Sequence, residues 1–145
     1  MSSIGGALKI IIQMNNTMWD MDGAICKDPK AYDDDGAEYE CDIRTAKLLN
    51  TPKEPIIVCT NRIERWRGIT LEWLSRHKVR VKSLIMQPYA TANERRRFSL
   101  PAKFKAKNYE TSGCDLFVES HKHIAKQIVT LTDKPVYCIE NGRYY

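Results

Sequence analysis

Short apolar runs rich in β-branched residues alternate along this chain with segments whose apolar residues recur at helical spacing. The run at residues 56–59 has no polar interruption, as expected for a strand that is buried on both faces. After it, Trp66, Ile69 and Trp73 recur at helical spacing. This alternation is typical of a mainly parallel sheet covered by helices. The sequence therefore predicts an α/β fold.

The other expected elements follow from the same patterns. Strands are expected at residues 8–14, 17–19, 56–59, 79–86, 115–118 and 136–139, and helices at residues 43–50, 64–77, 101–109 and 121–131. The turn-forming pair Asn15-Asn16 leaves open whether residues 8–19 form one interrupted strand or two. The polar segments 28–40 and 87–100 are predicted to be loops.

Length and composition exclude several classes of protein. With 145 residues, of which 43% are hydrophobic, the chain suits one globular domain, residues 1–145, and is too apolar for a disordered protein. Its longest apolar run, residues 10–12, falls far short of the roughly 20 residues that cross a bilayer. Residues 1–6 contain no basic residue of a secretory signal, and the five cysteines form no C-x-x-C pair. We therefore expect a cytoplasmic protein with no membrane partner, whose oligomeric state the sequence does not specify.

Polar residues suited to phosphoryl transfer follow several predicted strands or stand at the head of the helix that begins at residue 101. They are Asp20, Asp22, Thr60, Lys103, Lys105 and Glu119. In an open parallel sheet, ligands bind at the carboxyl ends of the strands, so we expect these side chains to converge there. Carboxylates, a hydroxyl and a lysine around one point suit phosphoryl transfer with Mg²⁺, because this cation prefers oxygen ligands and keeps several waters.

Three segments resemble motifs of the haloacid-dehalogenase-like (HAD) hydrolases. Residues 18–25, M-W-D-M-D-G-A-I, resemble the D-x-D-G-T signature, and residues 56–62, I-I-V-C-T-N-R, resemble the second motif, a buried strand ending in Thr or Ser. Residues 113–120, G-C-D-L-F-V-E-S, are similar to the fourth motif, a strand ending in acidic residues. The resemblance implies a HAD-like fold: a Rossmann-like three-layer sandwich with a mainly parallel sheet.

The resemblance also implies an activity, that of a Mg²⁺-dependent phosphate monoester hydrolase with an aspartyl-phosphate intermediate. Asp20 would be the nucleophile. Asp22 would give a proton to the leaving group and later take one from water. Thr60 would donate its hydroxyl to a phosphoryl oxygen, and Lys105 would neutralise charge on Asp20 and the phosphoryl group. Lys103 is the alternative to Lys105, because both stand near the start of the same predicted helix.

The ligands of the metal and of the substrate follow from the same resemblance. Mg²⁺ would be held by Asp20, by the main-chain carbonyl of Asp22 and by Glu119. Asn61 and Arg62, which complete the second motif, would contact the substrate. The partner implied is thus a phosphorylated molecule bound next to a magnesium ion.

Two residues depart from the HAD pattern. Ala24 stands where a Thr usually follows D-x-D-G, and Ser120 replaces the second acidic residue of the fourth motif. Losing a residue that supports a metal typically costs about 10- to 100-fold in affinity or activity. The alternative function is therefore a HAD-like protein that binds nucleotide or nucleic acid without turnover. A phosphotransferase would use the same residues as a hydrolase.

The spacing of the motifs leaves no room for a large cap domain. Between Asp22 and Thr60 only a short flap around residues 25–41 and one helix fit. By family analogy, an uncapped site is open and suits a bulky substrate. The layout is most similar to the 3′-phosphatase half of phage polynucleotide kinase, on residues 84–87 and the basic stretch that follows. Two clusters of arginines, at residues 62–67 and 95–97, would attract phosphate-rich molecules. Together with the layout, they favour a nucleotide or a nucleic-acid end as substrate.

Three further patterns are interpreted as surface features. The arginines at residues 95–97 are assigned to a solvated loop slightly in preference to a cationic rim of the site. The three aspartates at residues 33–35 are assigned to a solvated turn. His121 and His123 would lie about 200° apart on a helix, so they cannot share a metal ion and are assigned to the surface.

Overall fold

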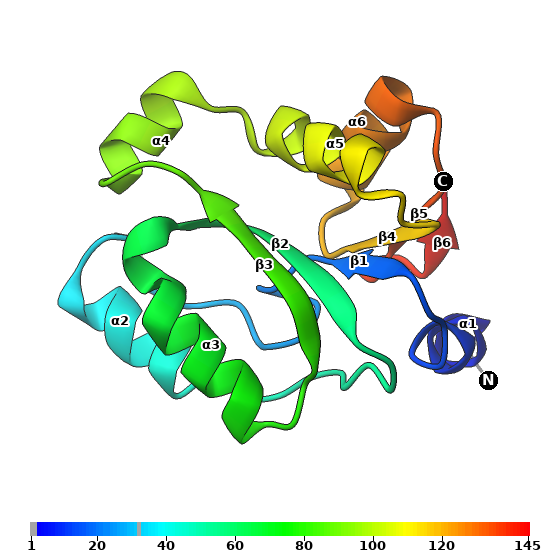
Figure 1. Ribbon diagram of the computed structural model, residues 1–145, viewed down its shortest axis with the longest axis horizontal. Helices are drawn as coiled ribbons and strands as arrows, with labels where there is room; N and C mark the ends of the chain where they lie inside the picture. The colour runs from blue at the N-terminus through cyan, green and yellow to red at the C-terminus, as the bar shows by residue number, and fades with distance from the viewer. Residues whose placement is uncertain (1–2, 32) are drawn as a thin grey trace.

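The computed structural model describes residues 3–31 and 33–145, and it has the predicted α/β fold (Figure 1). The elements of these residues are, in chain order, α1 (Ser3–Ile11), β1 (Thr17–Trp19), α2 (Ala37–Arg44), β2 (Ile56–Ile63), the 3₁₀ turn η1 (Glu64–Trp66), α3 (Arg67–Arg76), β3 (Val81–Gln87), α4 (Ala92–Phe98), α5 (Pro101–Ser112), β4 (Leu116–Glu119), α6 (Lys122–Thr132), β5 (Val136–Cys138) and β6 (Arg143–Tyr144). Met1 and Ser2, part of the segment used to judge a secretory signal, and Tyr32, part of the predicted flap, lie outside the described residues.

The order of the strands places the ends of β1, β2 and β4 side by side. Within the described residues the order is β3-β2-β1-β4-β5-β6. The first five strands are parallel, and β6 runs antiparallel to β5. From β1 the chain builds β2 and β3 on one side, then returns to place β4 and β5 on the other. The reversal lies between β1 and β4, which is where open α/β sheets bind ligands.

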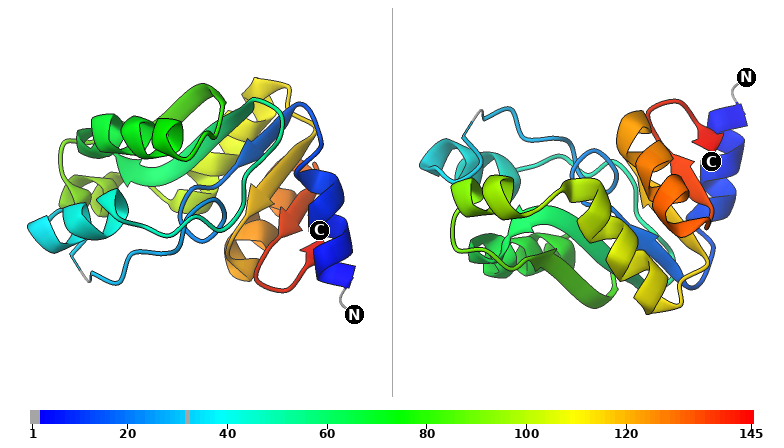
Figure 2. Two further views of the ribbon diagram at one scale, coloured as in Figure 1. Left: turned by 90° about the horizontal axis from the view of Figure 1, so that it is seen from below. Right: turned by 90° about the horizontal axis from the view of Figure 1, so that it is seen from above.

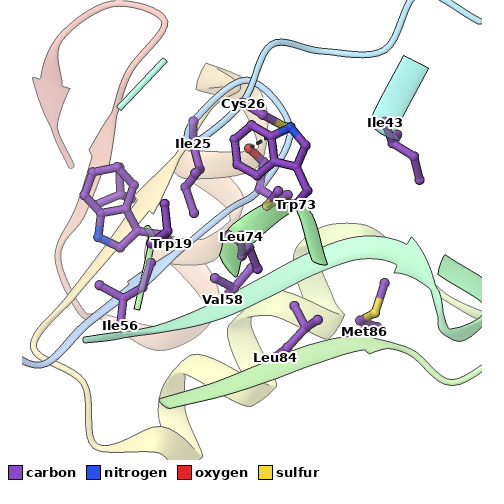
Figure 3. Close-up of a cluster of buried hydrophobic side chains, with 14 of the residues drawn as sticks. Trp19, Ile25, Cys26, Ile43, Ile56, Val58, Trp73, Leu74, Leu84 and Met86 are labelled. Atoms are coloured by element: carbon purple, nitrogen blue, oxygen red, sulfur yellow. Dashed lines mark hydrogen bonds between the residues drawn. The ribbon is translucent and has the colours of Figure 1, made fainter. Parts of the chain in front are cut away.

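Helices cover both faces of the sheet, so the predicted Rossmann-like three-layer arrangement is confirmed. α5 and α6 lie on one side of the sheet, and α2 and α3 lie on the other (Figures 1 and 2). Because successive strand residues face opposite ways, Trp19 packs in the core with α2 and α3, whereas Met18 packs with α5 and α6. Figure 3 shows the first core, in which Trp19, Val58 and Leu84 of three neighbouring strands belong to one cluster with Trp73 of α3.

Residues 8–14, which are expected to form a strand, are helical as far as Ile11. Ile11 is buried and Leu8 is half-buried, whereas Ile10 is exposed, which is a helical pattern. A short apolar run does not by itself separate a buried strand from a helix, and here the helix is formed. Asn16, with a φ of 60°, then turns the chain into β1. Residues 8–19 therefore contain the end of helix α1 and the strand β1.

The loop expected at residues 87–100 contains the helix α4. Its first turn is capped by Thr91, whose Oγ1 accepts a hydrogen bond from the backbone N–H of Glu94 at 3.2 Å. A Thr followed three residues later by Glu is the capping-box pattern, so a local signal for this helix is present in the sequence. The helix has no apolar stripe, and the arginine on its inner face, Arg95, is buried. Hydrophobic periodicity therefore misses it.

Other boundaries also differ from the prediction. The helix expected at residues 43–50 is α2, which begins and ends earlier because its buried face is made by Tyr39 and Ile43. β2 extends past Thr60, so this residue lies within the strand rather than after it. The short edge strand β6 was not predicted.

The flap predicted around residues 25–41 is shorter in the structure, where its C-terminal part belongs to α2. From here on, the flap means the loop of residues 27–36. Its described residues form no regular helix or strand. Asp28, Pro29, Ala31 and Asp34 line a pocket of about 480 Å³. The flap thus forms part of the wall of this pocket. Among the described helices, none has the length and the apolar character needed to span a bilayer.

Candidate active site

The register of the sheet brings the first and fourth sequence motifs together. Trp19, the last residue of β1, pairs with Val58 of β2 and with Val118 of β4. The backbone N–H of the next residue, Asp20, donates to the carbonyl of Val118 at 2.9 Å. Asp20 therefore stands beside Glu119, the last residue of β4, at the carboxyl end of the sheet.

Lys105 of α5 contacts both of these buried carboxylates. Its Nζ donates to Glu119 Oε1 at 2.8 Å and lies 3.2 Å from Asp20 Oδ1. Ser120 Oγ donates to the other oxygen of this aspartate, Asp20 Oδ2, at 2.7 Å. Lys103 is exposed. Of the two lysines that the sequence left as alternatives, it is Lys105 that lies beside Asp20.

Burial and charge together set the protonation of these groups. Burial raises the pKa of Asp20 to about 7, and the negative charge of Glu119 adds to the shift while Lys105 opposes it. Burial also disfavours a charged Glu119, but the Lys105 ammonium holds the pKa of this carboxyl below its usual value. Burial likewise disfavours a charged Lys105, yet the two carboxylates raise its pKa. Asp20 is thus the group whose charge depends most on what binds beside it.

Arg62 is the buried ion-pair partner of Asp22. Its Nη2 and Nε donate to the two carboxylate oxygens of Asp22 at 2.6 and 3.1 Å, and its Nη1 donates to Thr70 at 2.9 Å. Only 2% of Arg62 is exposed. Arg62 lines the pocket with its guanidinium bound to Asp22, and its expected contact with substrate stays a prediction. Because a bidentate Arg–carboxylate pair fixes orientation as well as charge, Arg62 is a positioning residue for Asp22.

Thr60 and Asn61 of β2 line the same pocket as these aspartates. Thr60 is 1% exposed, and its Oγ1 accepts a hydrogen bond from the backbone N–H of Arg62 at 3.2 Å. A hydroxyl that accepts from the backbone keeps its own proton for another acceptor. Asn61 Oδ1 accepts a hydrogen bond from Gln87 Nε2 at 2.8 Å, which fixes the orientation of this amide.

A pocket of about 480 Å³ opens at this end of the sheet, a volume within the range of small-molecule sites. Its lining includes Asp20, Asp22, Thr60, Asn61, Arg62 and Lys105. Glu119, the remaining predicted site residue, does not line it. This residue is fully buried, and its two oxygens accept hydrogen bonds from Lys105 Nζ and from the backbone N–H of His121. Glu119 is therefore paired with Lys105 in this structure, and its role as a metal ligand stays a prediction.

Two arginines of α4 also line the pocket, although we assigned them to a solvated loop. Arg95 Nη2 lies 2.7 Å and Arg96 Nη1 lies 2.8 Å from the carboxylate oxygens of Asp34 in the flap. Burial alone would raise the pKa of Asp34, but hydrogen bonds from the two arginines bring it below its usual value. The expected solvated turn at residues 33–35 is thus ion-paired to α4. Asp34 and Arg96 are 62 residues apart, so no local pattern indicates their contact.

The donors in the pocket suit a magnesium ion in kind and in charge. Among the described residues, no group of three or more His, Cys, Asp or Glu side chains is arranged to hold a metal ion. Mg²⁺ does not need such a group, because one or two carboxylates with water and substrate phosphate commonly hold it. Lys105 is one cation shared by Asp20 and Glu119, which leaves an excess of negative charge. Of the residues expected to hold the metal, Asp20 and Asp22 line the pocket, whereas Glu119 does not.

Comparisons with known proteins support the fold. No protein-family model matches the sequence, and a search of curated proteins finds no match. Among solved structures, a chain in the "Structure of the Pnkp1/Rnl/Hen1 RNA repair complex" has a similar fold, with a TM-score of 0.64 and 13% sequence identity. The likeness covers 84% of this chain and 41% of that chain, so this chain spans less than half of its length. At this identity the likeness establishes the fold alone.

The first prediction concerns Gly23, which follows the aspartates. Its φ is +82°, and a Cβ atom there would lie 2.8 Å from the Cβ of Ser120. Gly23→Ala should therefore lower the free energy of unfolding by about 1–3 kcal/mol, through backbone strain and displacement of Ser120. Gly68→Ala is the control, because a Cβ there meets nothing within 4 Å in helix α3. Urea denaturation that showed equal stability changes in the two variants would contradict this account.

The second prediction separates the two lysines. Lys105→Met should lower the free energy of unfolding by about 3–5 kcal/mol, because it leaves buried Glu119 without its counter-charge. Lys103→Met removes an exposed charge and should change stability by no more than about 0.5 kcal/mol. Adding Glu119→Gln to Lys105→Met should restore part of the loss, since the unpaired charge is then removed. A large loss in Lys103→Met, or none in Lys105→Met, would refute the assignment.

Proposed function

We propose that this chain is a phosphate monoester hydrolase of the HAD type, in which Asp20 attacks phosphorus. The observation that carries the proposal is the contact of Lys105 with Asp20, two buried residues of the pocket lining that we call its floor. The pocket lies at the carboxyl end of the sheet, where the strand order reverses between β1 and β4. A carboxylate that is held by a buried ammonium and reaches a pocket has the position of a nucleophile. Asp22 and Thr60 line the same pocket and supply the remaining functions.

In the proposed reaction, a carboxylate oxygen of Asp20 bonds to phosphorus as the bond from phosphorus to the ester oxygen breaks, and Asp22 gives its proton to the leaving oxygen. Water then attacks the phosphorus of the aspartyl-phosphate and loses a proton to Asp22, the bond from phosphorus to Asp20 breaks, and inorganic phosphate and the free Asp20 carboxylate are released. Lys105 offsets the charge that gathers on the phosphoryl oxygens, and the Thr60 hydroxyl donates to one of them. Arg62 keeps the carboxylate of Asp22 in a fixed orientation.

Mg²⁺ is part of the proposal. When bound by Asp20 and the main-chain carbonyl of Asp22, it would supply positive charge that draws a phosphate dianion to a floor with excess negative charge. The protein residues keep their own tasks beside it. Lys105 still holds Asp20, and Ser120 still orients it through a hydrogen bond of 2.7 Å.

The proposed substrate is a nucleotide or a nucleic-acid end. The pocket volume of about 480 Å³ accommodates a nucleotide, and Arg95 and Arg96 add positive charge to its lining. We call the part of the lining that these two arginines make with the flap the mouth of the pocket. The chain of similar fold belongs to an RNA repair complex, which agrees with such a substrate. The net charge of +5 favours approach of polyanions.

One observation favours a second candidate, a protein that binds the same ligands without turnover. An acid catalyst must carry a proton when it meets the leaving group, whereas the bidentate contact with Arg62 is one that an ionised Asp22 makes. In the hydrolase, Asp22 must therefore carry its proton beside the Arg62 guanidinium, which weakens these hydrogen bonds during the first step. In a binding protein, no such protonation is needed.

The third prediction tests the hydrolase directly. Purified protein with Mg²⁺ should release phosphate from para-nitrophenyl phosphate, and Asp20→Asn should reduce the rate on the order of 1000-fold or more, because the nucleophile is removed. Asp33→Asn, which removes one exposed negative charge from the flap, is the control and should keep the wild-type rate. Equal rates in wild type and Asp20→Asn would disprove nucleophilic attack by Asp20. Nucleotide binding with no phosphate release, with or without Mg²⁺, would favour the binding protein.

A further inference from the structure

The mouth of the pocket carries an anion-binding arrangement of its own, made by α4 and the flap. Arg95 and Arg96 each contact one carboxylate oxygen of Asp34, at 2.7 and 2.8 Å, and all three residues line the pocket. α4 and the flap lie at the same end of the molecule (Figure 2). Carboxylate and phosphate present similar pairs of oxygens to arginine. A phosphoryl group could therefore bind these arginines in place of Asp34.

The flap is anchored by contacts that do not use this carboxylate. Trp66 Nε1 donates to the main-chain oxygen of Asp34 at 3.2 Å. The carboxylate of Asp35 accepts from the backbone N–H of Ala92 at 3.0 Å and pairs with Arg65. Exchange of the Asp34 carboxylate for another anion would thus leave the flap attached to α4 and to η1. The ion pair of Asp34 is not needed to hold the flap in place.

Charge is distributed unevenly between the floor and the mouth of the pocket. At the floor, Lys105 is shared by two carboxylates, and Arg62 is matched by one. At the mouth, Arg95 and Arg96 together face the single carboxylate of Asp34. Asp28 of the flap also lines the pocket, but neither arginine pairs with it, so the contact with Asp34 leaves one of the two guanidinium charges unmatched by its own partner.

The two arginines of this pair differ in exposure. The side chain of Arg95 is 9% exposed, and it also donates to the main-chain oxygen of Asn61 at 3.3 Å, so it is part of the structure. The side chain of Arg96 is 53% exposed and is accessible to a ligand. The next residue, Arg97, does not line the pocket and lies over the ring of Phe98 at 5.2 Å.

We propose that Arg95 and Arg96 form a second phosphate-binding site at the mouth of the pocket, which Asp34 fills when no substrate is bound. This inference rests on the proposed function in taking the pocket to bind a phosphorylated substrate. It narrows the substrate class to molecules that carry a further phosphoryl group beyond the one at the floor. That further group is either the phosphodiester of a nucleic-acid strand or a second monoester.

The fourth prediction tests this site by binding, without turnover. Affinities for thymidine monophosphate, thymidine bisphosphate and a terminally phosphorylated thymidylate trinucleotide are measured by calorimetry with Mg²⁺ in the Asp20→Asn background, which cannot form the aspartyl-phosphate. Arg96→Ala should weaken binding of the trinucleotide, the bisphosphate or both about tenfold, through loss of one charge-assisted contact. The monophosphate, which reaches only the floor, should change by no more than about twofold. The probe that loses affinity identifies the source of the second phosphoryl group.

Arg97→Ala is the matched control, because it removes the same charge from the neighbouring position of α4. It should change the affinity for every probe by no more than about twofold. The slope of log affinity against log salt concentration for the trinucleotide should become less steep by about 0.7 in Arg96→Ala and stay unchanged in Arg97→Ala. A purely structural role for Arg96 would not produce this difference in slope.

Asp34→Asn tests whether the flap carboxylate competes with the ligand. Removing its charge should tighten binding of the affected probe several-fold beyond the change seen in Asp33→Asn, which alters the flap charge equally. Weaker binding in Asp34→Asn than in Asp33→Asn would overturn the competition.

Equal losses in Arg96→Ala and Arg97→Ala, or a monophosphate that binds as tightly as the longer probes, would overturn the second site. Either result would leave the hydrolase standing if Asp20→Asn still abolishes phosphate release. The hydrolase would fail separately if Arg96 controlled binding but Asp20→Asn kept the wild-type rate.

Discussion

One ammonium group, Nζ of Lys105, is the counter-charge of two carboxylates on neighbouring strands, and the candidate site depends on it. β1 and β4 are parallel and adjacent, so their register alone places Asp20 next to Glu119. Two buried carboxylates without a partner would each carry a desolvation cost of several kcal/mol. α5 therefore has to pack on the sheet in the position that brings Lys105 to this point. Fold and site rest on the same contact.

Residues whose place follows from local pattern could be predicted from the sequence. Asp20 and Glu119 come directly after or at the end of apolar strands, and any parallel sheet gathers the carboxyl ends of its strands at one edge. The α/β class follows from the same alternation of strands and helices. The choice between Lys103 and Lys105 could not be made, because only packing decides which side of α5 faces the sheet. The sequence thus predicts which edge carries the site but not every side chain in it.

The partners of the charged residues could not be predicted, because they come from distant parts of the chain. Arg62 and Asp22 are 40 residues apart, and Asp34 and Arg96 are 62 apart. Nothing in the sequence distinguishes Arg62 or Arg96 from an ordinary exposed arginine. Arg62 differs only in the folded structure, where it is buried against a carboxylate from another segment. α4 is missed for a related reason, since it is anchored by ion pairs rather than by an apolar stripe.

The separation of charge within the pocket has a consequence for how binding and chemistry are divided. A polyanion that approaches the molecule meets the exposed Arg96 before it reaches the buried floor. In the proposed hydrolase, contacts made at the mouth would be the same before and during the reaction, so they would contribute to affinity and act on KM. In the proposed reaction, contacts made by Lys105 and Thr60 would strengthen as charge moves onto the phosphoryl oxygens, so they would act on kcat. In such a hydrolase, substitutions in α4 and the flap would alter the substrate specificity, whereas the residues of the floor would keep the same reaction.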